Sequence, residues 1–269
     1  MIAVVDYQKG NLKSVERGLI AAGGEAFITA DASEIAKADA IVLPGVGAFA
    51  DAAATMCELG QMEAIRDRVR AGVPFLGICL GEHLMFEHGV EGAPEGNPAC
   101  GLGLLPGTVV AMPRCDAQGK AFKVPHVGWN TIEIPACGGS AAVPPCGEGG
   151  GNAVLSSGGA GGGAARSSAA KRGLFEPGAF PGSAPQAGSD LAFACPLFDG
   201  IAPGEYFYFT HSYIAPTGSH TIAETTHSTR FTSAVQYGDR AFGVQFHPEK
   251  SSDAGARVLA NFVAIAARG

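Results

Sequence analysis

The sequence predicts an α/β protein whose sheet is doubly wound and mostly parallel, with a mixed or antiparallel extension. Three observations predict this class. In the first half of the chain, short apolar runs alternate with amphipathic segments across short connections, which is typical of right-handed βαβ units. The second half holds short, turn-punctuated apolar segments, which indicate antiparallel pairing. One apolar run ends at a cysteine flanked by glycines, Gly77-Ile-Cys79-Leu-Gly81.

The first half supplies the parallel part of the predicted sheet. The expected strands are 2–5, 26–29, 40–43 and 75–78, and the expected helices are one capped by Asn11, 48–58, 61–71 and one after Cys79. Ligands of such sheets bind outside the carboxyl ends of the strands. Asp6, the Pro44–Gly47 turn and Cys79 each follow a predicted strand, so we expect them to meet at that edge.

The second half predicts the extension and a closing helix. Its expected strands are 108–112, 122–124, 131–134, 206–209, 221–225, 234–236 and 241–246. Ser252 or Asp253 can cap a last helix. The apolar face of that helix consists of Val258, Leu259, Phe262, Val263 and Ala266.

A stretch of unusual composition, roughly 136–194, separates these segments. It is rich in Gly, Ala, Ser and Pro, and it includes Gly158-Gly-Ala-Gly-Gly-Gly163. Such a stretch buries too little apolar surface to offset its ordering entropy. We therefore expect one domain over 1–269 that a disordered insert at about 136–194 interrupts.

Composition excludes several classes of protein. Of the 269 residues, 46% are hydrophobic and 16% are charged, which is typical of a globular protein. The net charge of −7 argues against nucleic acid as a partner. No apolar run approaches the ~18 residues of a membrane span, and the N-terminus opens as a strand without the basic residues of a signal peptide. These features predict a cytoplasmic protein.

The cysteines suggest neither disulfides nor a zinc ribbon. They are odd in number and contain no Cys-x-x-Cys pair. Cys79 and His83 are spaced as two ligands on one helix face, but two ligands are too few for a zinc site. We therefore expect no metal and no cofactor.

The Gly-x-Cys-x-Gly stretch is the strongest chemical signal. A sharp strand-to-helix turn would present Cys79 at the carboxyl edge of the sheet, as in a nucleophile elbow. The following helix N-terminus favours a thiolate, and the Leu80 amide is placed to donate to an oxyanion. A buried core cysteine is the alternative interpretation.

A thiolate nucleophile needs a base and a group that orients it. The predicted strand 241–246 leads into His247-Pro-Glu249. The short spacing lets the Glu249 carboxylate accept a hydrogen bond from the His247 ring and fix its tautomer. By itself this tripeptide is a weak signal, since a solvated loop can carry it.

Together these stretches resemble the class I glutamine amidotransferases, and among them the glutaminase subunits of imidazole glycerol phosphate synthases. The stretches that carry the resemblance are Met1-Ile-Ala-Val-Val-Asp-Tyr7, Gly10-Asn-Leu12, Leu43-Pro-Gly-Val-Gly-Ala-Phe49, Gly77-Ile-Cys-Leu-Gly81, His126-Val-Gly-Trp-Asn130, Tyr206-Phe-Tyr-Phe-Thr-His-Ser-Tyr213 and Gly243-Val-Gln-Phe-His-Pro-Glu-Lys-Ser251. The resemblance implies a flavodoxin-like class I glutaminase fold. It covers the chain except the insert.

The resemblance also implies hydrolysis of L-glutamine to glutamate and ammonia through a cysteinyl thioester. Cys79 is then the nucleophile, His247 the proton shuttle and Glu249 its orienting group. The backbone amides of Leu80 and of Val46 or Gly47 are the implied oxyanion donors. The implied substrate-binding residues are His83, Gly45, His211, Ser212 and Tyr213. The implied partner is a (β/α)8-barrel cyclase that forms a heterodimer with the glutaminase and uses its ammonia in histidine biosynthesis.

Two positions depart from the family. The family usually has Gln at position 83 and a hydrophobic residue at position 82, where this chain has His83 and Glu82. If His83 faces bound glutamine, protonation near its ordinary pKa of about 6.5 would make glutamine binding pH-dependent. A carboxylate at Glu82 would disfavour the nearby thiolate.

Two other functions stay open at this point. One is the glutaminase subunit of an anthranilate or aminodeoxychorismate synthase, against which the stretches 126–130 and 207–213 argue. The other is a catalytically weakened scaffold subunit, which His83 favours and the intact Cys79, His247 and Glu249 oppose.

Overall fold

The computed structural model describes residues 1–135 and 193–268. The insert predicted at about 136–194 therefore lies outside the described residues, apart from its last two. Among the helices of the described part, none is long and apolar enough to cross a membrane.

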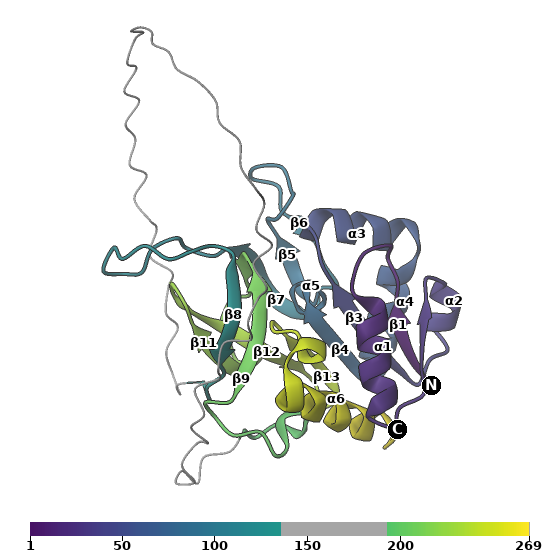
Figure 1. Cartoon of the computed structure of the whole chain (residues 1–269). Helices are drawn as coiled ribbons and strands as arrows, with labels where there is room; N and C mark the ends of the chain where they lie inside the picture. The colour runs from purple at the N-terminus through teal and green to yellow at the C-terminus, as the bar shows by residue number, and fades with distance from the viewer. Residues whose placement is uncertain (136–192, 269) are drawn as a thin grey trace, which may run out of the picture.

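A seven-stranded sheet forms the centre of the protein (Figure 1). Its order is β11-β12-β13-β4-β3-β1-β2, and the strands are β1 (Ile2–Val5), β2 (Ala26–Thr29), β3 (Ala40–Gly45), β4 (Phe75–Cys79), β11 (Thr221–Thr226), β12 (Arg230–Tyr237) and β13 (Ala241–Val244). The five strands from β13 to β2 run parallel, whereas β11 and β12 pair antiparallel. This arrangement confirms the predicted parallel sheet with an antiparallel extension.

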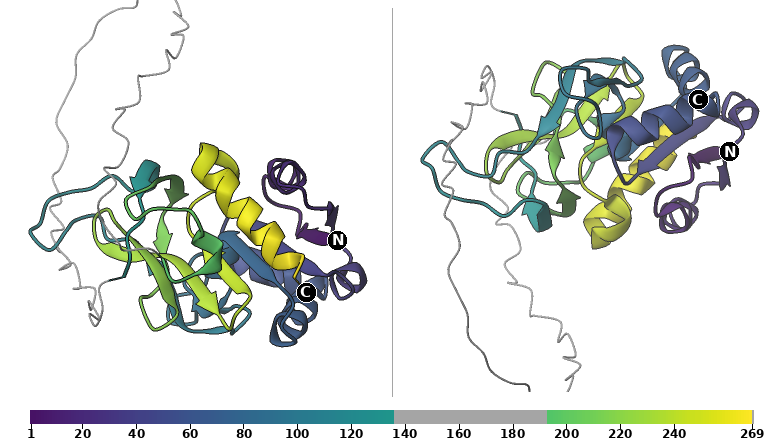
Figure 2. Two further views of the ribbon diagram at one scale, coloured as in Figure 1. Left: turned by 90° about the horizontal axis from the view of Figure 1, so that it is seen from below. Right: turned by 90° about the horizontal axis from the view of Figure 1, so that it is seen from above.

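Helices cover both faces of the parallel strands. On one face lie α1 (Leu12–Ala21) and α6 (Ser252–Ala266), and on the other lie α2 (Ala32–Ile35), α3 (Phe49–Glu58) and α4 (Gln61–Arg70) (Figures 1 and 2). Alternate strand residues feed the two resulting cores: Val4 packs with the α1 and α6 side, while Val5 packs with the α2 to α4 side. The two-residue period of a strand explains this division.

Two smaller sheets flank the antiparallel end. One has the order β10-β7-β5-β6, and the other is a two-stranded ribbon of β8 and β9. Their strands are β5 (Phe86–Gly89), β6 (Ala99–Cys100), β7 (Leu105–Ala111), β8 (His126–Thr131), β9 (Tyr206–His211) and β10 (Tyr213–Ile214), with short 3-10 turns at Pro196–Phe198 and Pro248–Lys250. In Figure 1 the ribbon lies at the end of the molecule away from the two termini.

The structure corrects several local predictions. The helix after Cys79 is a single turn, α5 (Leu80–His83), because the chain turns at once into β5. The strand expected at 131–134 is instead β8, which ends at Thr131 because its register follows β9. Residues 122–124 form no strand, and α2 was not foreseen. Asn11 precedes α1 and Ser251 precedes α6, and neither side chain makes a cap hydrogen bond.

One buried polar side chain ties the carboxyl ends of β1 and β2 to α4. The Gln61 amide donates to the carbonyl of Asp6 at 2.8 Å and to that of Ala30 at 2.9 Å. Gln61 is fully buried. It therefore fixes the loop after β1, whose next residue, Tyr7, reaches the functional edge of the sheet.

We expect Gln61→Met to lower the free energy of unfolding by about 2 kcal/mol, because two carbonyls each lose a hydrogen bond worth roughly 1 kcal/mol. Urea unfolding measures this loss. The matched control is Glu63→Met on the exposed side of the same helix, which should change stability by less than about 0.5 kcal/mol. Equal effects of the two substitutions would contradict the structural role of Gln61.

Candidate active site

The turn at Cys79 is as sharp as the sequence predicts. Cys79 ends β4 with φ +54° and ψ −107°, a backbone conformation that is costly for a residue with a side chain. Its two flanking glycines are required by close packing. A Cβ on Gly77 would lie 2.5 Å from the Gly81 carbonyl oxygen, and one on Gly81 would overlap the Leu43 carbonyl of β3.

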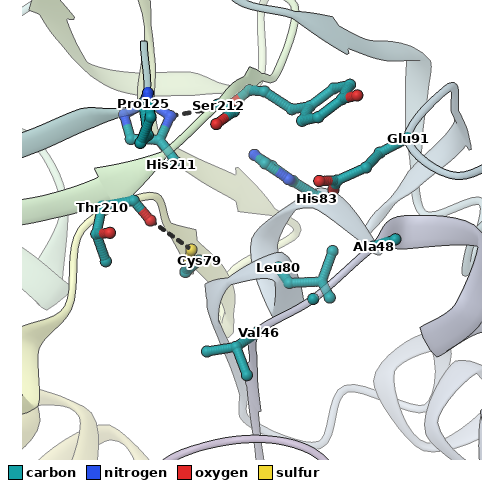
Figure 3. Close-up of a pocket in the computed structure, with 12 residues that line it drawn as sticks. Val46, Ala48, Cys79, Leu80, His83, Glu91, Pro125, Thr210, His211 and Ser212 are labelled. Atoms are coloured by element: carbon teal, nitrogen blue, oxygen red, sulfur yellow. Dashed lines mark hydrogen bonds between the residues drawn. The ribbon is translucent and has the colours of Figure 1, made fainter. Parts of the chain in front are cut away.

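A cavity of about 410 Å³ opens beside this turn. Figure 3 shows Thr210 and His211 on one side of it and Leu80, His83 and Glu91 on the other. Its lining residues are Val46, Gly47, Ala48, Cys79, Leu80, His83, Glu91, Pro125, Thr210, His211, Ser212 and Tyr213. The carboxyl ends of β3 and β4 thus meet segments from the second half of the chain.

His247 and Glu249 form a buried pair at the end of β13. His247 Nδ1 lies 3.0 Å from Glu249 Oε1, and both side chains are nearly inaccessible. Burial lowers the pKa of His247, but the favourable interactions of the charged ring with Cys79 and Glu249 outweigh burial and raise that pKa to about 9. Nε2 of the ring has no hydrogen bond to the described residues. Cys79, His247 and Glu249 therefore lie close together in the structure.

The predicted oxyanion donors differ in their availability. Leu80 begins α5, so its amide has no acceptor within the helix. The Val46 amide instead donates to the Tyr7 hydroxyl at 3.1 Å. Burial raises the pKa of Tyr7 and keeps the hydroxyl neutral. Gly47 lines the cavity with φ +101°, a conformation that favours glycine.

Gly45 does not line the cavity. A Cβ there would lie 2.6 Å from the Tyr7 hydroxyl and 2.8 Å from Leu80 Cβ. Since Gly45 is the register partner of Cys79 in β4, the structure uses its small size to let β3 approach the turn.

His83 lines the cavity but already has a protein partner. Its Nε2 lies 2.7 Å from Oε1 of Gln245, and the Gln245 amide nitrogen lies 3.7 Å from Cys79 Sγ. Burial lowers the pKa of His83 to about 4, against a smaller opposing effect of Gln245. The expected titration of His83 near pH 6.5 is therefore wrong, because the ring is buried.

Burial favours the neutral form of Glu82. It is fully buried, and neither carboxyl oxygen has a hydrogen bond to the described residues. Burial, together with the nearby Cys79, raises its pKa well above the ordinary value. The same burial that raises this pKa therefore reduces the expected electrostatic conflict with a thiolate.

The segment 210–213 contributes mainly backbone and hydroxyl groups. His211 lines the cavity, but Nδ1 donates to the Tyr213 carbonyl at 2.8 Å, and Nε2 accepts from His126 Nδ1 at 3.0 Å. The Asn130 amide in turn donates to His126 at 3.3 Å. Burial lowers the pKa of both rings, that of His126 to about 4. Both nitrogens of His211 are thus occupied.

Three polar groups of the site were not predicted from the sequence. Gln245 lies two residues before His247. Residues two apart in a strand point to the same face, so this spacing could have indicated that Gln245 belongs to the site. Glu91 projects a half-buried carboxyl group into the cavity from the loop after β5, and burial raises its pKa. The Thr210 carbonyl accepts from the Cys79 thiol at 3.9 Å (Figure 3). No local pattern marks Glu91 or Thr210.

Among the described residues, no cluster of His, Cys, Asp and Glu suits a metal ion.

We expect His83→Gln to make the protein less sensitive to acid. The folded-state pKa of about 4 lies below the ordinary 6.5, so the stability that neutral His83 contributes is present above pH 6.5 and is lost as the pH falls toward 4. The loss reaches at most about 1.4 kcal/mol per pH unit. Urea unfolding at pH 6.5 and 4.5 should show a smaller difference in the variant, whereas the control His88→Gln, at a more exposed position, should match the parent.

Comparison with known proteins places this site in a family. The model of class-I glutamine amidotransferases matches residues 3–134 and 181–266. The imidazole glycerol phosphate synthase subunit HisH of Moorella thermoacetica is 37% identical over 263 residues, 97% of this chain and 93% of that protein. The HisH subunit of Rhodopirellula baltica is 36% identical over 264 residues, 97% and 96% of the two chains.

Solved structures agree at the level of the fold. A structure described as a glutamine amidotransferase has a TM-score of 0.58 at 16% identity and covers 99% of this chain and 100% of its own. PurLQS from Thermotoga maritima has a TM-score of 0.56 at 14% identity, with 98% and 97% covered. With the elbow at Cys79 and the His247–Glu249 pair behind it, the chain belongs to the class-I glutamine amidotransferase family and, within it, to the HisH subunits.

Proposed function

We propose that the protein hydrolyses L-glutamine to glutamate and ammonia and supplies the ammonia to a cyclase subunit of imidazole glycerol phosphate synthase. The observation that carries this proposal is the placement of Cys79 on a strained turn beside the cavity, with His247 and Glu249 buried next to it. The HisH relatives support the identity of the larger enzyme.

Catalysis begins with an ion pair of thiolate and imidazolium. With a pKa of about 9, His247 holds a proton at neutral pH. The Cys79 thiolate attacks the side-chain amide carbon of glutamine, and the carbonyl π electrons move to oxygen. As the tetrahedral intermediate collapses, the carbon–nitrogen bond breaks and His247 protonates the nitrogen, which leaves as ammonia.

Water completes the cycle. Neutral His247 now removes a proton from water, which attacks the thioester carbon. The second tetrahedral intermediate expels the Cys79 thiolate and releases glutamate, so the thiolate–imidazolium pair is restored. Glu249 accepts from Nδ1 throughout and keeps Nε2 directed at the reacting atoms.

The oxyanion of each intermediate needs two donors. The Leu80 amide supplies the first. Gly47 supplies the second more directly than Val46, because the Val46 amide is held by Tyr7. Leu80 and Gly47 both line the cavity.

Substrate recognition combines one charge with several neutral groups. Glu91 is the carboxyl group that lines the cavity, and it is suited to the α-ammonium group of glutamine. Ser212 and Tyr213 also line the cavity and offer polar groups there. His83 can still present Nδ1 as an acceptor, since Nε2 faces Gln245.

The partner surface is the exposed face of the β8–β9 ribbon. Val127, Trp129 and Tyr206 are 54%, 41% and 56% exposed there, and large apolar groups at the surface of a subunit mark interaction sites. Pro125 and His211 stand at the ends of the two strands and line the cavity. A cyclase bound to the ribbon would therefore border the place where ammonia is released.

The first test replaces the nucleophile. Cys79→Ser should reduce glutamate release about a thousandfold or more, while the fold and the affinity for the cyclase are retained. The matched control Cys195→Ser removes another buried thiol and should retain activity. Alkylation by an electrophilic glutamine analogue should modify Cys79. Modification mainly at Cys57 or Cys115 would contradict the assignment.

The second test addresses the partner surface. Tyr206→Asp should weaken binding of the matching cyclase at least about tenfold, because a charge replaces an exposed apolar ring that the complex would bury. Titration calorimetry measures the Kd. Ile20→Asp on α1 is the control, since Ile20 is 53% exposed on another element. If Ile20→Asp weakens the complex and Tyr206→Asp does not, the ribbon is not the interface.

A further inference from the structure

We infer that His83 is a positioning residue that acts on the nucleophile through Gln245: it orients the Gln245 amide so that its N–H group is donated to Cys79 Sγ. The three side chains form a continuous buried line. His83 Nε2 is 2.7 Å from Gln245 Oε1, and Gln245 Nε2 is 3.7 Å from the sulfur. The inference rests on the proposed function only in taking Cys79 as the nucleophile.

The proton positions along this line follow from elementary chemistry. An amide oxygen accepts hydrogen bonds and cannot donate them. The His83 nitrogen that faces Gln245 Oε1 must therefore carry the proton of the neutral ring. With Oε1 held in this way, the NH2 group of Gln245 is directed at Cys79.

The direction of the amide decides which state of the sulfur it stabilises. An NH2 group donates, so it favours a thiolate, which accepts strongly, over a thiol, which accepts weakly. The competing thiol state has its own acceptor, because the Cys79 thiol can donate to the Thr210 carbonyl at 3.9 Å. Gln245 is fully buried and His83 is 3% exposed, so water competes little for these bonds.

Other ionisable groups surround the sulfur and set the background of the test. Tyr7 approaches from the end of β1, Glu82 from α5 and His247 from the end of β13, and each has an electrostatic interaction with Cys79. His211 adds a neutral ring from β9. His247 is the cation among them, and Gln245 adds a neutral donor that does not titrate.

This role can be tested with two other side chains at position 83. A glutamine amide there also carries an N–H donor, so it can orient Gln245 in the same way. A leucine cannot. The comparison of these two side chains therefore separates positioning from space filling.

The experiment measures the rate of alkylation of Cys79 by iodoacetamide from pH 5 to 10 on the full chain, with the modified peptide identified by mass. In His83→Leu and Gln245→Met the pH of half-maximal rate should rise by roughly one unit, the size expected for one hydrogen bond to a charged group. His83→Gln should have the same midpoint as the parent protein. Gln236→Met, which removes an amide that donates to Gly238 at the surface, should leave it unchanged.

Each outcome of this experiment either supports the inference or overturns it. Thermal unfolding first establishes that each variant is folded. If His83→Leu does not fold, Gln245→Met still tests the inference. A midpoint that stays constant in both variants overturns the inference, and one that falls shows that the amide oxygen faces the sulfur, which also overturns it. Because alkylation reports the sulfur itself, a failure of glutamine hydrolysis would contradict the proposed function without affecting this result.

Discussion

The packing of the Cys79 turn between β3 and β13 is the constraint on which the rest of the structure depends. No Cβ fits at Gly45 on β3, at Gly77 and Gly81 beside the cysteine, or at Gly243 on β13, where it would lie 2.7 Å from Glu82 Cγ. Interiors of this density transmit small changes in shape. The position of the nucleophile is therefore set by close packing at these glycines, against backbone atoms at Gly77 and Gly81 and against side chains at Gly45 and Gly243.

The electrostatics of the site follow from burial. Burial favours the neutral forms of Glu82, His83, His126 and His211. His247 is the exception, because its interactions with Cys79 and Glu249 favour the charged ring. A single imidazolium surrounded by neutral hydrogen-bond donors can stabilise a thiolate without stabilising a second negative charge nearby.

Hydrogen-bonded chains of neutral side chains fix the orientation of the groups around Cys79. One chain runs from Asn130 through His126 to His211, and a second runs from His83 through Gln245 to Cys79. At each step of these chains a donor faces an acceptor, and this pairing fixes the orientation of each ring and amide. Such networks give the site rigidity as well as polarity.

The sequence by itself determined the alternation of strands and helices, the strained cysteine turn and the short His247–Glu249 spacing, because each depends on residues close together in the chain. The apolar periodicity of β1, β4 and α6 is likewise local. Tertiary structure alone decided that Tyr7 holds Val46, that Gln245 stands between His83 and Cys79, and that Glu91 faces the cavity. These contacts join segments far apart in sequence, and the charge states of Glu82 and His83 depend on a burial that local sequence does not encode.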